Sequence, residues 1–326
     1  MTYKVAIIGC GMIAGLYEDF DISSIYSHAK AYSKHKDFGE MAFYDSDSER
    51  AKLLAEKVDG KTYNNLNEIL SLFQPDIVSL CVPDDLHFKM TQAILMHENC
   101  PKLIFAEKPV CEDQSELNII KQLESNSNSK VLVNHSRRFD KAHERLRKLF
   151  KNGDLGSLVR IHVDYYGGWR HLGVHVVDIL QYFFNEEINL NKLEYFCESK
   201  YSSDPTLNVN GNIGSATIDF QGHLEEFYQI LDINIMCQQG QVKLSDFGNK
   251  IEVFRKIINA ENENVLLIDK NFSEVGMESP MKTAIDIISE FLRNADHDRL
   301  LPYGLSEANK TMRTLWKGTE IYAARS

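Results

Sequence analysis

The sequence predicts an α/β protein with two domains. The first is expected to hold a doubly wound parallel sheet, and the second is an α+β domain with a large open, mainly antiparallel sheet. A chain of 326 residues exceeds the size at which one hydrophobic core usually keeps growing. Short apolar runs alternate with helical ones up to residue 134, which is typical of parallel strands joined by crossover helices. Beyond that point, successive β-like runs with short polar connections favour an antiparallel sheet.

The first domain, residues 1–134, supplies the parallel sheet. Its expected strands are residues 4–8, 40–44, 77–82, 103–106 and 131–134. Its expected helices are residues 48–58, 66–72, 86–96 and 114–125. Several of these helices are opened by Asp or Ser residues, which suit the N-cap position.

The second domain, residues 135–326, has a different pattern of predicted helices and strands. Helices are predicted at 139–151, from about Gly173 onward and at 306–324. An alternative for the last of these helices is to pack on the first domain. Strands are predicted at 157–166, 193–201, 213–220, 226–236, 241–245, 251–257 and 264–268. No Pro- or Gly-rich linker separates the domains, so we expect close packing with a ligand site between them.

Composition excludes several classes of function. The net charge of -11 argues against nucleic-acid binding, which needs basic patches; the basic stretch at 137–148 is expected to be a solvated helix face. The six cysteines form no metal-binding or disulfide pattern, so we expect no metal site. No apolar run is long enough to span a membrane, and the strand at residue 4 leaves no room for a signal peptide. We therefore expect a cytoplasmic protein.

A glycine-rich string follows the first strand and reads Gly9-Cys10-Gly11-Met12-Ile13-Ala14. Between a strand and an expected helix, this spacing is typical of a dinucleotide-binding Rossmann turn. Gly9 permits the tight turn, Gly11 leaves room for a pyrophosphate, and Ala14 lets the helix approach the sheet. We expect Met12 and Ile13 to line the same turn, whose free N–H groups attract phosphates. The alternative is a turn of two glycines in an α/β protein that binds no nucleotide.

The second expected strand ends at Asp45, which strengthens the nucleotide-binding interpretation. A carboxylate there can accept hydrogen bonds from the adenosine ribose and would repel a 2'-phosphate. The sequence therefore favours NAD(H) as cofactor over NADP(H). The interval from Gly9 to Asp45 is longer than in the simplest pattern, and we attribute the excess to an inserted loop within residues 17–26.

Three further strings are Cys81-Val82-Pro83-Asp84-Asp85-Leu86-His87, Glu107-Lys108-Pro109 and Gly173-Val174-His175-Val176-Val177-Asp178. Together they resemble the Gfo/Idh/MocA family of glucose-fructose oxidoreductase and inositol 2-dehydrogenase type. The resemblance implies a lysine beside the nicotinamide, often with a cis bond before the proline. It also implies that the cofactor contacts Cys81, Pro83, His87, Glu107 and Lys108.

The resemblance also implies an alcohol or ketone chemistry. Lys108 would hydrogen-bond the reacting oxygen, and His175 would give or take the proton, as an imidazole can near neutral pH. The family commonly carries an Asp four residues before this histidine, and this chain has His171 there. We therefore include His171 among the catalytic candidates. Asp178 is expected to support the local structure.

The predicted function is NAD(H)-dependent hydride transfer to or from a secondary alcohol or ketone carbon of a sugar, cyclitol or nucleotide-sugar. Arg138 and Trp169 are candidate substrate contacts. Two alternatives stay open: a dinucleotide-binding regulator of the same fold, and an enzyme that uses NAD for a redox-neutral reaction. By analogy with the family we expect a homodimer or homotetramer, with no membrane or nucleic-acid partner.

Overall fold

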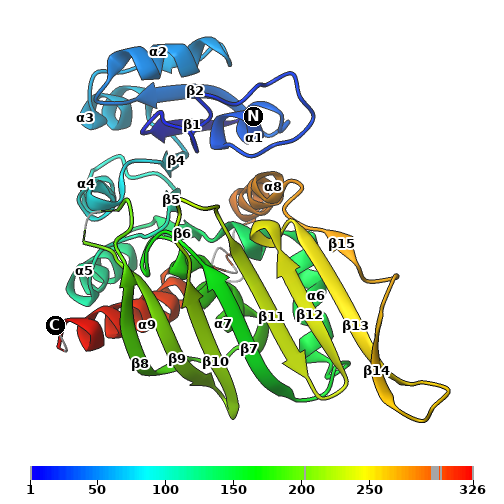
Figure 1. The fold of residues 1–326 in the computed structure, drawn as a ribbon. Coiled ribbons are helices and arrows are strands. Elements are labelled where there is room, and N and C mark those ends of the chain that lie inside the picture. Colours follow the sequence, from blue (N-terminus) through cyan, green and yellow to red (C-terminus); the bar gives the residue numbers. More distant parts are fainter. Residues whose placement is uncertain (1, 202, 295–300, 302, 325–326) are drawn as a thin grey trace. The chain divides into compact units, whose positions relative to one another are not determined.

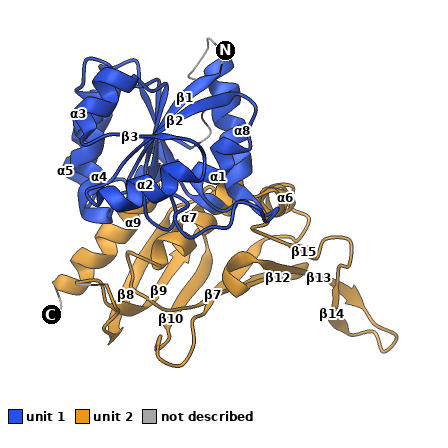
Figure 2. Cartoon of the chain, turned by 90° about the horizontal axis from the view of Figure 1, so that it is seen from above, with its two compact units in different colours: residues 1–136, 279–309 blue, residues 137–278, 310–326 orange. Residues whose placement is uncertain are grey.

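The computed structural model describes residues 2–201, 203–294, 301 and 303–324. The chain divides into two compact units, drawn in blue and orange in Figure 2. Unit 1 comprises residues 1–136 and 279–309, and unit 2 comprises residues 137–278 and 310–326. The chain first passes from unit 1 to unit 2 after residue 136, two residues beyond the domain boundary that we predicted at 134. The return of residues 279–309 to unit 1 is a feature that our division of the sequence did not include.

Unit 1 is built on a parallel sheet with the strand order β3-β2-β1-β4-β5-β6, as expected for a doubly wound fold (Figure 1). The strands are β1 (Tyr3–Ile8), β2 (Phe38–Tyr44), β3 (Lys61–Thr62), β4 (Ile77–Leu80), β5 (Leu103–Glu107) and β6 (Lys130–Asn134). Every residue of β4 is buried, because helices cover both faces of a parallel sheet. The long apolar runs of these strands made them predictable.

Some helices of unit 1 begin where the sequence supplies a capping side chain. The helices are α1 (His28–Ser33), α2 (Ser48–Glu56), α3 (Leu66–Glu68) with a π-helical turn (Ile69–Phe73), α4 (His87–Leu95), α5 (Gln114–Ser125) and α8 (Pro280–Arg293). The Asp47 carboxylate accepts a hydrogen bond from the Glu49 N–H at the start of α2, and Asp113 does the same for Glu116 at the start of α5.

Helix α8 was absent from our sequence-based assignment. It buries an apolar face that includes Ile285, Ile288 and Phe291, and it packs beside α1. The Ser289 hydroxyl and the Arg293 guanidinium both donate to the carboxylate of Asp37. These contacts explain why a segment far along the chain folds with unit 1.

The glycine-rich string does not open a regular helix, which corrects our expectation. Residues 11–17 form turns, and Gly15 has a φ of +125°, outside the helical region. The helical register nevertheless continues after a gap. The carbonyls of Ile13 and Ala14 accept the N–H groups of His28 and Ala29, at 3.1 and 3.0 Å. Residues 15–27 thus separate two stretches that share one helical register, and the inserted loop that we placed within residues 17–26 stays a prediction.

Unit 2 contains a sheet with the order β14-β13-β12-β11-β7-β10-β9-β8, with β15 paired to β13. Its strands are β7 (Leu158–Tyr165), β8 (Ile188–Cys197), β9 (Thr206–Ile213), β10 (Ala216–Gly222), β11 (Leu231–Cys237), β12 (Gly240–Ser245), β13 (Lys250–Ile258), β14 (Asn264–Ile268) and β15 (Glu274–Val275). Only β7 and β10 pair in parallel among these strands, so the predicted mainly antiparallel sheet is confirmed.

Helices cover one face of this sheet (Figure 1). They are α6 (Lys141–Lys151), α7 (Gly173–Phe184) and α9 (Leu305–Ala323). Inward-facing side chains of the strands, such as Ile161 and Val163 of β7, are fully buried, while His162 between them is only partly buried. This alternation is typical of a sheet with one covered and one open face.

The strand predicted at 213–220 is confirmed over residues 216–220 of β10, but it was begun too early, because the chain turns at residues 214–215. Gly214 adopts a φ of +55° and joins β9 to β10 as an antiparallel pair. The strand predicted at 226–236 begins only at Leu231. Within the described residues, no helix is long and apolar enough to cross a membrane.

Candidate functional site

The glycine-rich turn of unit 1 is packed on one side and open on the other. Gly9 has a φ of +85°, and a Cβ there would lie 2.6 Å from the backbone carbonyl of Cys81. A Cβ on Gly11 would meet no atom within 4 Å. Ala14 is fully buried. The turn thus rests against the end of β4 and leaves free space at Gly11, where the fingerprint places a pyrophosphate.

Asp45 is fixed at the end of β2, next to this turn. Its Oδ2 accepts the Cys10 N–H at 2.6 Å, and its Oδ1 accepts the Asp47 N–H at 2.9 Å. Burial, together with the negative charge of Asp45, raises the pKa of the Cys10 thiol to about 12. The cysteine therefore stays a neutral packing residue, and the carboxylate is the charged group at this position.

Two predicted cofactor residues are unusually open for apolar side chains. Met12 is 77% exposed and Ile13 is 39% exposed. Both directly follow Gly11, so an extended ligand seated on the turn would cover them.

The carboxyl ends of β4 and β5 are joined by His87. Its Nε2 lies 2.8 Å from the carbonyl oxygen of Val82, and its Nδ1 contacts the carbonyl oxygen of Pro109. The ring is fully buried, so His87 holds these two loops together. The cis bond expected between Lys108 and Pro109 is confirmed.

Glu107, which precedes the candidate lysine, belongs to a buried polar network. Its Oε1 lies 2.9 Å from His28 Nε2 and accepts the Asn134 side-chain N–H at 2.5 Å. Ser79 Oγ lies 3.1 Å from His28 Nδ1 and 3.0 Å from the Tyr32 hydroxyl. Strands β4 and β6 and helix α1 thus contribute side chains to the network around Glu107, which directly precedes Lys108.

This network determines the charge of Glu107. Burial by itself raises the pKa of the carboxyl, but the hydrogen bond and charge of His28, the Asn134 bond and the charge of Lys108 together lower it. Glu107 is therefore an anion directly before Lys108. Sequence reasoning missed His28 and Asn134 as partners of Glu107, because the His28 contact spans 79 residues.

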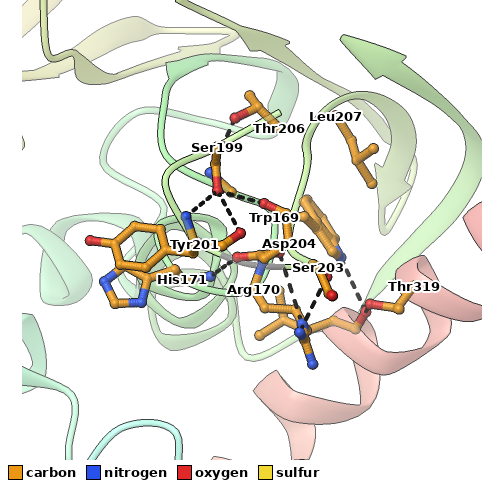
Figure 3. A network of polar contacts seen from close by, with 12 residues as sticks. Trp169, Arg170, His171, Ser199, Tyr201, Ser203, Asp204, Thr206, Leu207 and Thr319 are labelled. Atoms are coloured by element: carbon orange, nitrogen blue, oxygen red, sulfur yellow. Dashed lines mark hydrogen bonds and ion pairs between the residues drawn. The ribbon is translucent and has the colours of Figure 1, made fainter. Parts of the chain in front are cut away.

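In unit 2, the two candidate histidines lie around the start of α7: His171 precedes the helix, and His175 is in its first turn. His171 and His175 are both partly exposed, and the His171 ring stacks on Tyr201 with 3.5 Å between ring centroids (Figure 3). The carboxylate of Asp204 accepts the backbone N–H of Arg170 and that of His171, each at 2.8 Å. Nothing in the sequence pointed to Asp204, which lies 33 residues beyond His171.

The two predicted substrate contacts have structural partners within unit 2. Arg138 donates from Nε and Nη2 to the carboxylate of Asp178 at 2.8 to 3.0 Å, and both side chains are buried. The Thr311 hydroxyl of α9 donates to the same carboxylate at 2.9 Å. Trp169 is 1% exposed and donates from Nε1 to the Leu315 carbonyl. Contact of Arg138 or Trp169 with substrate stays a prediction.

The polar groups of the described residues are not arranged for metal binding. No group of three or more His, Cys, Asp or Glu side chains among those residues is placed to hold an ion. Unit 1 offers a lysine and an anchored glutamate on the sheet that carries the glycine-rich turn, and unit 2 carries the two candidate histidines.

Comparisons with known proteins agree with this geometry. Residues 3–135 match the family model described as an oxidoreductase family with an NAD-binding Rossmann fold, GFO_IDH_MocA. The chain is 21% identical over 259 residues to inositol 2-dehydrogenase of Salmonella typhimurium, covering 74% of this chain and 69% of that one.

Solved structures match over nearly the whole chain. A structure described as a putative NADPH-dependent oxidoreductase from Desulfitobacterium hafniense has a TM-score of 0.79 at 14% identity, covering 100% of this chain and 96% of that one. A mutant of Gal80p from Saccharomyces cerevisiae has a TM-score of 0.77 at 15% identity, covering 100% and 97%. At these identities the structural likeness establishes the fold alone.

Proposed function

The chain belongs to the Gfo/Idh/MocA oxidoreductases, and we propose that it transfers hydride between NAD(H) and a secondary alcohol or ketone carbon of a sugar, cyclitol or nucleotide-sugar. One observation carries the proposal. The open turn at Gly11 and the anchored Glu107-Lys108 pair follow β1 and β5 of one parallel sheet. The carboxyl ends of parallel strands share an edge, which is where such sheets bind nucleotides.

The residues present in unit 1 fit a dinucleotide. Free space at Gly11 suits a pyrophosphate, and the exposed Met12 and Ile13 offer apolar contact beside it. Asp45 places a carboxylate at the end of β2, where it would bind ribose hydroxyls and repel a 2'-phosphate. This charge supports NAD(H) as the preferred form of the cofactor.

The nicotinamide, when bound, supplies or accepts the hydride. In the proposed reaction the Lys108 ammonium donates a hydrogen bond to the reacting oxygen and stabilises negative charge that develops there. The Glu107 anion beside it favours the charged form of the lysine. His175 accepts the hydroxyl proton during oxidation and returns it during reduction.

A substrate screen tests the proposal. Cyclitols, sugars and nucleotide-sugars are offered with NAD, and the keto forms are offered with NADH, while NADH absorbance is followed. We expect a compound of this class to change the absorbance. NADH binding without turnover across the panel would contradict the proposal and favour a regulatory protein of the same fold.

A further inference from the structure

The turn between β10 and β11, residues 223–230, lies beside the segment that leads to His171. Strands β7 and β10 pair in parallel up to the last residue of each strand. The N–H of His223 then donates to the Tyr165 carbonyl at 2.8 Å. Because the chain continues from β7 toward His171 and α7, the turn after β10 flanks the start of that path.

Lys200 connects this turn to the candidate histidine. Its ammonium lies 2.8 Å from the carboxylate of Glu225 in the turn and 5.3 Å from the centre of the Tyr201 ring. The Tyr201 ring stacks on that of His171 with 3.5 Å between the centroids (Figure 3). A continuous series of side chains therefore leads from His171 to the turn.

The turn is held in place and still exposes two aromatic rings. Its backbone closes with a bond from the Phe227 N–H to the Leu224 carbonyl at 3.2 Å, and the Gln229 amide donates to the Glu225 carboxylate at 3.4 Å. Phe227 is nevertheless 71% exposed and Tyr228 is 59% exposed. Neighbouring aromatic rings left open on a fixed turn are a feature of binding surfaces.

The polar groups around these rings are mostly acidic. Glu225 and Glu226 belong to the turn itself, and Asp164 of β7 contacts the first residue of the turn, at 3.0 Å. Asp232 follows the turn, and its pKa is raised chiefly by burial and further by the negative charge of Asp164. Lys200 brings one positive charge to these four carboxyl groups. Negative charge on a ligand would therefore be repelled here.

These features distinguish among the three classes of substrate in the proposed function. A nucleotide-sugar carries a diphosphate, which cations would have to bind. Two cations of this region are already paired, Lys200 with Glu225 and Arg170 with Asp204, whose Oδ1 lies 3.9 Å from the arginine Nε. A lone sugar or cyclitol at the histidines gives the exposed rings no partner. A second, neutral sugar ring would place its C–H groups on an aromatic face and its hydroxyls on carboxylate and amide groups, and the turn offers both.

We propose that residues 224–229 form an outer subsite for a neutral sugar ring, so that the substrate is a glycoside or oligosaccharide in which this ring is joined to the one that reacts. Phe227 and Tyr228 stack on the ring, and Glu225 and Gln229 hydrogen-bond its hydroxyls. The inference rests on the proposed function, but binding at the outer subsite is measurable without turnover.

Ligand titrations followed by NMR test the outer subsite. Maltose, cellobiose, glucose and UDP-glucose are titrated with NADH present into the full-length wild type, Phe227→Ala, Phe227→Trp and Tyr195→Ala. We expect at least one disaccharide to bind the wild type about tenfold more tightly than glucose does, and Phe227→Ala to lose that advantage. Phe227→Trp keeps an aromatic face and should retain it. Tyr195→Ala removes an aromatic ring of β8 that is 49% exposed, and it should leave the advantage unchanged.

The outcomes separate the subsite from the alternatives. No disaccharide binding, equal disaccharide affinity in wild type and Phe227→Ala, or an equal loss in Tyr195→Ala would each overturn the inference. A preference for UDP-glucose that depends on Phe227 would also overturn it and assign the turn to a nucleotide base. Because both positions are exposed, the Tm of each variant should stay within about 2 °C of the wild type. Disaccharide binding at the subsite without turnover of any compound would contradict the proposed function alone.

Discussion

His28 Nε2 lies 2.9 Å from Glu107 Oε1, so a side chain of α1 holds the carboxylate that directly precedes Lys108. His28 is fully buried and its other ring nitrogen faces Ser79. His28→Leu removes both bonds and leaves a buried anion without this donor. We expect a loss of about 2–3 kcal/mol in the free energy of unfolding, measured with urea.

A matched variant exists in the same network. Tyr32→Phe removes only the bond between the Tyr32 hydroxyl and Ser79, for which about 1 kcal/mol is expected. Equal losses in the two variants would mean that the Glu107 carboxylate gains nothing from His28.

Cofactor selectivity should depend on the charge of Asp45. Asp45→Ser removes the carboxylate that would face a 2'-phosphate. The affinity for NADPH relative to that for NADH should therefore rise by about tenfold or more. Fluorescence titration with both nucleotides measures the ratio. Asp47→Ser is the control, since it removes a nearby negative charge that caps α2. An equal change in the control would assign the effect to net charge alone.

The insertion in the first helix should be removable in register. Deleting residues 16–26 places His28 four positions after Ile13, which matches the observed bond from the His28 N–H to the Ile13 carbonyl. We expect this deletion to fold and to bind NADH. Deleting residues 17–26 instead shifts the register by one and should lower the Tm further. Equal stability of the two deletions would contradict a continuous helical register.

Acid should destabilise unit 2 through His143. This ring is fully buried, and burial lowers its pKa below the ordinary 6.5 more than the neighbouring Asp140 raises it. The unfolded chain therefore binds a proton before the folded one does. The stability from neutral His143 is present above pH 6.5 and is lost as the pH falls through the folded pKa.

The size of this effect follows from proton linkage. The free energy of unfolding should fall by up to about 1.4 kcal/mol per pH unit in this range. His143→Gln removes the titrating group and should flatten the decrease. Urea denaturation at about pH 7.5 and about pH 5.5 compares the two proteins. An equally steep decrease in the variant would assign it to other groups.

The parallel sheet of unit 1 was predictable because its information is local. Strands such as β4 and β5 are short apolar runs bounded by polar residues, and a sheet covered on both faces needs this pattern. The interrupted first helix was not predictable. Its continuity depends on a backbone hydrogen bond between Ile13 and His28 across an irregular segment. The hydrophobic periodicity of the sequence gives no sign of such a bond.

The errors in unit 2 have a related cause. The run at 213–220 is β-like throughout, and only the positive φ at Gly214 reveals that it holds a turn between two strands. Helix α8, which belongs to unit 1, was missed as well: its apolar face is clear in the structure, but in the sequence it follows a series of β-like runs.

Likewise, only part of the candidate site could be predicted from the sequence. The turn at Gly9 and the cis bond after Lys108 followed from contiguous strings. His28 and Asp204 did not, because each acts on a residue far away in the chain, Glu107 in one case and His171 in the other. Buried polar partners of this kind are fixed by the fold, and the sequence near them carries no motif.

Lys108 carries the central claim, and Lys108→Met tests it most directly. The variant keeps the length of the side chain and removes the ammonium that would bind the reacting oxygen. Turnover of the compound found in the substrate screen is measured by NADH absorbance, and NADH binding is measured by fluorescence. We predict that Lys108→Met binds NADH as the wild type does and loses turnover by at least about a thousandfold. Undiminished turnover in this variant would contradict the proposed mechanism.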